Sequence, residues 1–452
     1  MNSIGAISVP SKIEGIYQDD VNGFLLVCNP LDMNGIHVLD NRTTKIFNLC
    51  CGLKSIAEIS FQCEEDINYT SAVVNALYEK GIIRIGDTSI ASFSKKHLKK
   101  QLDSWFHITN NCNLACKYCY INRTNESMSF ETAKKAIDSL IASAVLYGKT
   151  SIRVKFAGGE PLLEFPLIKR IVSYARWAGD TKGVDFIFNI ITNGTLISKD
   201  ISEYIKSEEM SVSVSLDGIG EYHNCQRGGF SRVERGITVL QDNEVIPSIL
   251  VTVSELSLMG LPALTEYLLD RGLPFRFSLF RELEVRNDSP IKSDDNFNHR
   301  VITTLHQCYD IIETMLPKKE LPQFHKLCDI DITRKRMRNC GIGSNGVVVG
   351  HNGQIAICQA LLDHPVGTVF SGDPLTLVRN QSEYKIGSYS VDKNTECNSC
   401  IWRYVCTGGC PLLTTLKNGS FSARSPFCEV FKEMIPRLLR IHGLQIINKN
   451  SK

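Results

Sequence analysis

The sequence lacks any long hydrophobic run. In 452 residues no apolar stretch approaches the about 18 residues that a membrane span requires, and the N-terminal segment MNSIGAISVP has no charged-then-apolar signal pattern. The sequence also lacks an excess of either charge, since 50 Lys and Arg against 48 Asp and Glu leave a net charge of +2 at pH 7. These absences predict a cytoplasmic protein with no membrane and no nucleic acid among its partners.

Glycine (32) and proline (15) are too few for a fibrous or low-complexity protein, and 43% hydrophobic residues indicate real cores. The length predicts about three domains at roughly 150 residues each. What the chain has in excess is cysteine, with seventeen residues. In a long chain without a signal peptide, cysteines predict metal ligands or catalysis rather than disulfides. Three of them lie within eight residues, and seven lie between Cys340 and Cys428.

The first 90 residues are predicted to form a small winged-helix-like domain. Two strands, at 24–28 and 35–39, precede three short helices, and Gly81 ends the third helix. A generic winged helix that binds DNA is the alternative, which the near-neutral charge makes less attractive. The basic segment KKHLKK at 95–100 then indicates a solvated linker over 91–103, which marks a domain boundary.

Residues 104–320 alternate short apolar runs with amphipathic segments such as 129–146, which is typical of parallel strands covered by helices. The fold class is therefore α/β, with a partial (β/α)6 barrel whose working groups lie at the carboxyl ends of the strands. The rest of the chain, 321–452, is rich in Gly and Cys, is expected to need metal to fold, and ends in a helix near 430–441. The six predicted strands are 105–108, 152–156, 186–191, 212–216, 249–253 and 275–279.

Cys112, Cys116 and Cys119 follow directly after the first predicted strand. A structural zinc site is the alternative, but zinc usually takes four ligands and no fourth Cys or His is near in sequence. Iron–sulfur clusters are held by thiolates. Three thiolates on a cube of four irons leave one iron open for a small chelating molecule.

At these residues the sequence resembles the radical S-adenosylmethionine (SAM) superfamily. CNLACKYCY is similar to that family's cluster loop, with the aromatic Tyr118 before the third cysteine. Gly158, Gly159 and Glu160 end the second strand and resemble the motif that holds the methionyl amino group. Two glycines let the backbone approach a ligand closely, and a glutamate can bind an ammonium. The resemblance implies a [4Fe–4S] cluster on three cysteines, with SAM as cofactor.

Asn193 ends the third strand, and Ser215 and Asp217 end the fourth. For Asn193 and Asp217 the alternative is turn chemistry before a glycine. The resemblance implies that Ser215 contacts the nucleoside and that Arg227 pairs with the methionyl carboxylate, which a guanidinium grips in bidentate fashion. His223 stays unassigned, and no catalytic acid or base is nominated.

The C-terminal cysteines resemble the seven-cysteine pattern called SPASM, which implies one or two auxiliary [4Fe–4S] clusters. Related sulfatase-maturing enzymes have a further cysteine where this chain has Gly346. The first auxiliary cluster therefore has three assigned thiolates, and its fourth site is either open to a substrate thiolate or filled by Cys328 or another residue. By position, Cys340, Cys358 and Cys410 fall to the first cluster, and Cys397, Cys400, Cys406 and Cys428 to the second. The remaining cysteines, at positions 28, 50, 51, 63, 225 and 308, are expected to be small core residues.

The N-terminal domain resembles the precursor-recognition element of ribosomal-peptide maturation systems. The resemblance implies a precursor peptide as partner, whose leader adds as a strand to an exposed sheet edge. A reductant such as flavodoxin or ferredoxin is the second implied partner.

Together these resemblances imply an oxidoreductase that modifies a ribosomally made peptide after abstracting hydrogen with a 5′-deoxyadenosyl radical. An intramolecular thioether from Cys sulfur to carbon, as in sactipeptides or ranthipeptides, is the first choice of product. A carbon–carbon or aryl cyclophane link is the second and formylglycine-forming sulfatase maturation the third. A non-catalytic metal-cluster protein that binds a peptide is the alternative from a different class.

Overall fold

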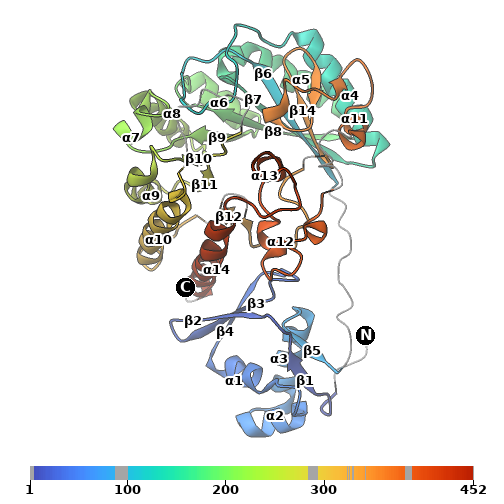
Figure 1. The fold of residues 1–452 in the computed structure, drawn as a ribbon, viewed down its shortest axis with the longest axis vertical. Helices are drawn as coiled ribbons and strands as arrows, with labels where there is room; N and C mark the ends of the chain where they lie inside the picture. Colours follow the sequence, from blue (N-terminus) through green and yellow to red (C-terminus); the bar gives the residue numbers. More distant parts are fainter. Residues whose placement is uncertain are drawn as a thin grey trace.

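The computed structural model describes residues 5–86, 100–283, 294–322, 324, 326, 327, 330–341, 343–381 and 389–450. The molecule is elongated, with the N-terminal unit at one end and the large sheet at the other (Figure 1). None of the helices in these ranges is both long and apolar enough to cross a membrane.

The six predicted strands of the α/β core are confirmed. They pair in parallel and in chain order, as expected for a partial barrel. Burial alternates along them, so one face packs under helices while the polar residues of the other face stay half-exposed. The strands are β6 (Gln101–Thr109), β7 (Ser151–Gly158), β8 (Asp185–Thr192), β9 (Ser211–Ser215), β10 (Ser248–Val253) and β11 (Phe275–Leu279).

The helix-facing side of this sheet carries a row of aromatic rings, the first pair edge-to-face and the second stacked. Phe106, Phe156 and Phe188 occupy adjacent strands and are almost fully buried, with ring centroids 6.3 and 5.9 Å apart between neighbours. Burying side chains of this size supplies much of the free energy that holds helices on a sheet. The helices between or after the strands are α4 (Phe130–Leu146), α5 (Phe165–Asp180), α6 (Lys199–Ser207), α7 (Glu221–Asn224), α8 (Phe230–Asp242), α9 (Leu261–Asp270) and α10 (Phe297–Met315).

The C-terminal region extends the same sheet. β14 (Gly346–Val349) pairs in parallel with β6, and β15 (Gln354–Ala356) and β16 (Gly367–Thr368) continue it in antiparallel fashion. The expected boundary at 320 therefore does not separate two sheets. The remaining elements are the short pair β12 (Lys326–Leu327) and β13 (Ile330–Asp331), with α11 (Pro374–Asn380), α12 (Arg403–Cys406), α13 (Pro411–Asn418) and α14 (Cys428–Asn450).

The N-terminal unit has the three expected helices but more strands than the two predicted. A three-stranded sheet, β2-β3-β4, is joined by a separate antiparallel pair of β1 with β5. Ser55 caps the second helix through a capping box with Glu58. The elements are β1 (Pro10–Lys12), β2 (Tyr17–Val21), β3 (Phe24–Cys28), β4 (Ile36–Leu39), α1 (Asn41–Leu49), α2 (Ile56–Cys63), α3 (Ile67–Glu79) and β5 (Ile83–Ile85).

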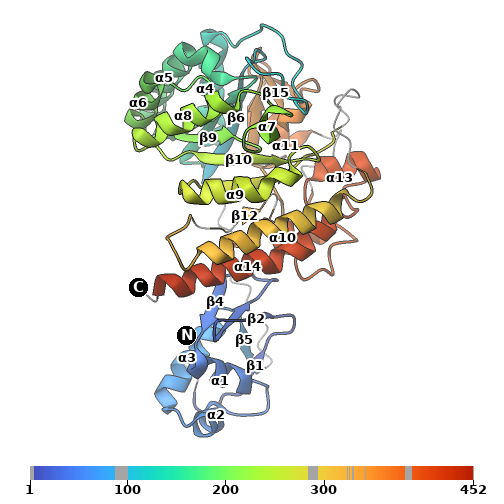
Figure 2. The ribbon, with the colours of Figure 1, turned by 90° about the vertical axis from the view of Figure 1, so that its left-hand side faces the viewer.

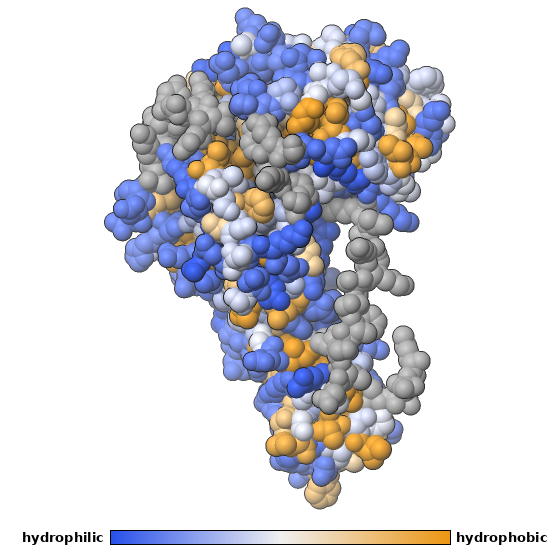
Figure 3. Space-filling view, turned by 45° about the vertical axis from the view of Figure 1, so that its right-hand side comes forward, coloured by the Kyte–Doolittle hydropathy of each residue, from blue (hydrophilic) through white to orange (hydrophobic). Residues whose placement is uncertain are grey.

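The N-terminal sheet is covered on both faces. Leu25 and Val27 pack with the core of α1–α3, while Leu26 and Cys28 join the main hydrophobic core. Helix α14 packs on this second face and lies between the N-terminal unit and α10 (Figure 2). Figure 3 shows the unit as a narrower lobe that carries apolar as well as polar side chains on its surface.

Two expectations need correction. Most of the predicted linker at 91–103 lies outside the described residues, but Gln101–Asp103 belong to β6. Among the cysteines expected in the core, Cys28, Cys50 and Cys308 are buried, whereas Cys51 is exposed because it lies in the turn before α2. Cys63 and Cys225 are half-buried.

Candidate radical SAM site and auxiliary cluster sites

The three cysteines of the first motif lie in the loop that follows β6. All three are half-buried, and burial raises the pKa of the Cys112 and Cys116 thiols, with Cys119 close enough to contribute to both. Side-chain donors reach two of the sulfurs: Asn193 Nδ2 is 3.9 Å from Cys112 Sγ, and Arg227 Nη1 is 3.9 Å from Cys116 Sγ. Donors of this kind suit thiolates that carry a cluster, because hydrogen bonds to sulfur stabilise its negative charge.

The two glycines after β7 lie against the cysteine loop. The Gly159 N–H donates to Thr109 O at 2.8 Å, and a Cβ added at Gly159 would lie 2.1 Å from Asn111 O. A Cβ at Gly158, which has φ +136°, would lie 2.4 Å from Thr109 O. The two glycines were expected to let the backbone approach a ligand. They also let the backbone of this turn lie directly against the backbone of the cysteine loop, where a side chain would not fit.

Glu160 is fully buried directly behind this turn. Its carboxylate accepts hydrogen bonds from the Asn193 N–H at 2.7 Å, the Thr192 hydroxyl at 2.7 Å and the Leu162 N–H at 3.0 Å. Burial raises the pKa of Glu160 to about 7, against the effect of these three donors. A cationic ligand group beside Glu160 would favour its charged form.

Asp217 connects the cluster loop to the ends of β9 and β10. It accepts the Tyr118 hydroxyl, lies 2.5 Å from Arg227 Nε, and accepts the Thr252 N–H at 2.7 Å. The Arg227 guanidinium also lies over the Tyr118 ring, 4.9 Å from its centroid. Three of the predicted site residues, Tyr118, Asp217 and Arg227, are thus brought into one network around the buried Asp217 carboxylate.

Of the other predicted residues, Asn193 both stabilises a turn and faces the cysteine loop, and Ser215 lies at the end of a strand. The Asn193 Oδ1 accepts the Thr195 N–H at 2.9 Å, so the turn chemistry is present, while its Nδ2 faces Cys112. Ser215 is the last residue of β9 and is half-buried. The previously unassigned His223 is buried and accepts the Asp217 N–H at Nδ1, which positions that carboxylate. Thr252 and Tyr120 were missed; only their places, after a strand and after a motif cysteine, could have pointed to them.

The first auxiliary set comes together from three separate segments. Burial raises the pKa of the Cys358 thiol to about 12, and both Cys410 and Cys340 add to this shift. Tyr120, beside Cys119, is half-buried; burial raises its pKa, and both Cys119 and Cys358 contribute. Cys358 of the first auxiliary set and Cys119 of the first cysteine loop thus both act on the Tyr120 side chain. Cys328 lies outside the described residues.

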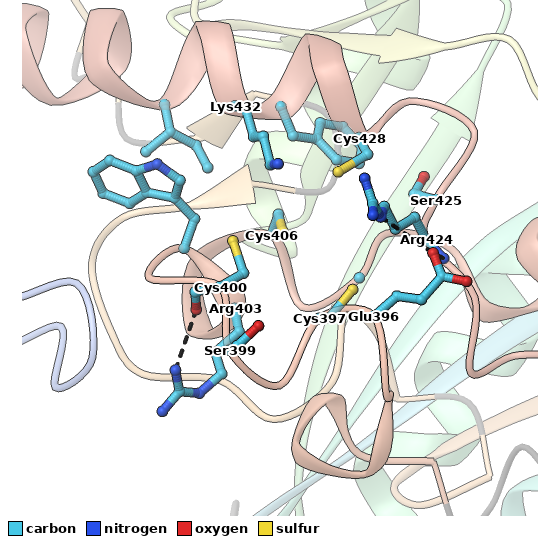
Figure 4. Close-up of a pocket in the computed structure, with 14 residues that line it drawn as sticks. Glu396, Cys397, Ser399, Cys400, Arg403, Cys406, Arg424, Ser425, Cys428 and Lys432 are labelled. Atoms are coloured by element: carbon cyan, nitrogen blue, oxygen red, sulfur yellow. Dashed lines mark hydrogen bonds and ion pairs between the residues drawn. The ribbon is translucent and has the colours of Figure 1, made fainter.

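The second auxiliary set lines one cavity of about 240 Å³ beneath the start of α14, and the sulfurs face into it (Figure 4). Burial raises the pKa of the Cys397 thiol to about 11 and of the Cys406 thiol to about 12. Four thiols facing one enclosed space fit a [4Fe–4S] cluster. The four are Cys397, Cys400, Cys406 and Cys428.

In the part of the chain that the structure describes, no group of three or more His, Cys, Asp or Glu side chains is arranged to hold a single metal ion. A four-iron cluster takes its thiolates at the corners of a cube, which is a wider arrangement than one ion requires.

Residues 106–266 match the family model described as the radical SAM superfamily. The chain is also 32% identical over 199 residues to an uncharacterised protein of Methanocaldococcus jannaschii, covering 42% of this chain and 67% of that protein. The chain belongs to the radical SAM superfamily. Enzymes of this superfamily use a [4Fe–4S] cluster together with SAM, and the match spans the cysteine loop, the Gly158–Glu160 turn and Arg227.

Two further matches extend beyond this region. The antilisterial bacteriocin subtilosin biosynthesis protein AlbA of Bacillus subtilis is 24% identical over 359 residues, which cover 75% of each chain. The crystal structure of Streptococcus suis SuiB bound to its precursor peptide SuiA has a TM-score of 0.55 and 16% identity, and it covers 93% of this chain and all of that one. The second likeness shows that the fold extends over the N-terminal unit and the C-terminal cysteine region.

Proposed function

We propose that this radical SAM enzyme installs an intramolecular thioether in a ribosomally made precursor peptide. One observation carries the proposal: Cys119 of the first cysteine loop and Cys358 of the first auxiliary set both lie within electrostatic reach of Tyr120. With Cys340, Cys358 and Cys410 as three ligands, one iron of that auxiliary cluster is left for a cysteine of the substrate. The likeness to AlbA, named for subtilosin biosynthesis, supports this choice.

At the first site, Cys112, Cys116 and Cys119 would hold the cluster and leave its fourth iron to SAM. Gly158, Gly159 and Glu160 would receive the methionyl amino group. When bound, the cluster and SAM supply a 5′-deoxyadenosyl radical that removes one hydrogen atom from a peptide carbon.

On the other side of this site, Arg227 would pair with the methionyl carboxylate. Asp217 and the Tyr118 ring already hold that guanidinium in place, so little side-chain entropy remains to be lost on binding. Ser215 and Asn193 would contact the rest of the cofactor.

The proposed bond formation balances with the auxiliary site as electron acceptor. The substrate cysteine would lose its proton and its sulfur would join the carbon that has lost a hydrogen atom, and a cluster held by Cys340, Cys358 and Cys410 would take up the one electron left over. A small redox protein such as flavodoxin or ferredoxin would reduce the first cluster. Thiolate-held clusters of this kind fit a reducing compartment such as the cytoplasm.

The leader of the precursor would add as a strand to the N-terminal sheet. Both faces of that sheet are covered, by α1–α3 and by α14, so its edge strands β2 and β4 are the positions at which a peptide backbone can pair. The likeness to SuiB over the N-terminal unit is in keeping with this placement.

The test uses peptide extract from a strain of the source organism that lacks the enzyme. Extract is incubated anaerobically with SAM, dithionite and either the reconstituted protein or the C112A/C116A/C119A variant, and is then analysed by mass spectrometry. We expect a peptide that loses two hydrogen atoms with the intact protein alone, and whose modified cysteine resists alkylation.

If the modified peptide forms but all its cysteines can still be alkylated, the product is a carbon–carbon link and not a thioether. Modification that survives the triple cysteine change would refute the radical mechanism. A peptide that binds to both proteins but is altered by neither would leave the non-catalytic alternative.

A further inference from the structure

The cavity of the second auxiliary set is lined by charge as well as by sulfur. Its walls include Glu396, Arg403, Arg424 and Lys432 in addition to the four cysteines (Figure 4). Charges this close to a cluster affect how readily the cluster accepts an electron, because the reduced form carries one more negative charge than the oxidised form.

Two of the three cations already have carboxylate partners. Arg424 Nε lies 3.1 Å from Glu396 Oε2, and Arg403 Nε lies 3.7 Å from Asp392 Oδ1. Lys432 has no carboxylate within 4.0 Å among the residues that the structure describes. Among the described residues it is therefore the cation of this cavity that has no carboxylate partner.

The helix explains why Lys432 is close to the sulfur. Cys428 is the first residue of α14 and Lys432 lies four residues later, so the two side chains share one face of the helix. Figure 4 shows both on the side of α14 that faces the cavity. The ammonium thus acts electrostatically at one ligand of the cluster.

We propose that Lys432 is a positioning residue for electron transfer, which stabilises the reduced form of the cluster held by Cys397, Cys400, Cys406 and Cys428. A four-iron cluster on four thiolates carries about two negative charges when oxidised and about three when reduced. An unpaired ammonium therefore stabilises the reduced form more and raises the midpoint potential. The inference rests on the proposed function only in that this cavity holds a cluster.

The test is a redox titration of the reconstituted full-length protein, followed by electron paramagnetic resonance without any peptide. The signal of this site is the one that Cys397→Ser removes. We expect Lys432→Gln to shift its midpoint potential downward, Lys432→Glu to shift it further, and Lys432→Arg to restore it. Lys449→Gln, on the exposed last turn of the same helix, serves as the matched control and leaves the potential unchanged.

A second measurement varies the ionic strength. Because Lys432 is exposed, added salt screens its charge, so the potential of the wild-type site falls as ionic strength rises, and more steeply than in Lys432→Gln. Equal potentials in the wild type, Lys432→Gln and Lys432→Glu would overturn the inference while leaving the cluster in place. If no signal depended on Cys397, the cluster itself would be absent and the proposed use of this cavity would fail instead.

Discussion

At the scale of single residues, the motifs predicted which side chains meet but not what holds them. Tyr118, Glu160, Asp217 and Arg227 were recognisable because the motifs around them resemble those of the radical SAM superfamily. Their partners were not, because a hydrogen bond such as that from the Thr252 N–H to Asp217 joins residues 35 positions apart. His223 shows the same limit: its buried ring supports Asp217 through the backbone, and sequence alone leaves such a histidine without a role.

The buried Glu160 carboxyl predicts how the stability of the fold depends on pH. Its pKa of about 7 in the folded protein lies above the ordinary value of 4.5, so the folded state binds more protons between these values. The stability that this group contributes is therefore full below about pH 4.5 and is lost as the pH rises through about 7, by roughly 3 kcal/mol. Glu160→Gln removes this titration, so urea unfolding of the cluster-free variant should depend less on pH in that range. An unchanged pH dependence would contradict the buried carboxylate.

Gly159 makes a prediction about packing. Gly159→Ala places a Cβ where it would lie 2.1 Å from Asn111 O, so the cysteine loop must move. We expect a loss of several kcal/mol in stability and poor retention of the first cluster, seen as fewer irons per chain. Gly148→Ala is the control, since it meets nothing within 4 Å and adds only the strain of a positive φ.

At the scale of elements, the local pattern predicted strands and helices well and long-range pairing poorly. The six core strands follow from alternating apolar residues, and each occurs within a few residues of its predicted range. The pairing of β14 with β6 joins positions 346–349 to 103–106, and no local signal specifies a partner so distant along the chain. The cover of the N-terminal sheet by α14 was unexpected for the same reason.

The contact between α14 and this sheet gives an element-scale prediction. Gly443 lies under Leu26, and a Cβ there would lie 2.5 Å from Leu26 Cδ1. Gly443→Val should therefore loosen the N-terminal sheet from α14, at a cost of about 1–3 kcal/mol. Hydrogen exchange should quicken across β2–β4 while uncoupled cleavage of SAM stays unchanged. The exposed Lys449→Val serves as control, and equal exchange in both variants would rule out this packing role.

At the scale of the whole molecule, the N-terminal unit contacts a residue that lines the cavity of the second auxiliary set. The Tyr17 ring packs edge-on against Trp402, with centroids 5.7 Å apart, and Trp402 lines the cavity of that set. Leu31 packs against the small group of buried side chains formed by Val391, Cys397 and Tyr404. The unit expected to recognise the peptide therefore contacts the region expected to carry electrons, which a division of the sequence into separate domains did not predict.

Because Trp402 contacts both regions, we expect Trp402→Ala to affect the N-terminal unit and the second auxiliary site. Truncating the indole leaves a cavity between Tyr17 and the cysteine set, which should cost about 3–5 kcal/mol. We expect faster proteolysis of the N-terminal unit and faster loss of iron from the second auxiliary site. Trp177→Ala, at an exposed indole on α5, should change neither rate. Faster proteolysis with unchanged iron retention would mean that the two regions are not coupled.

The most direct test of the central claim is an anaerobic count of iron and sulfide per chain, followed by deoxyadenosine release from SAM on adding dithionite. Three four-iron clusters predict about twelve irons together with cofactor cleavage. About eight irons with cleavage would mean that one auxiliary site does not hold a cluster. Little iron, bound zinc and no deoxyadenosine would contradict the radical SAM chemistry derived for this protein.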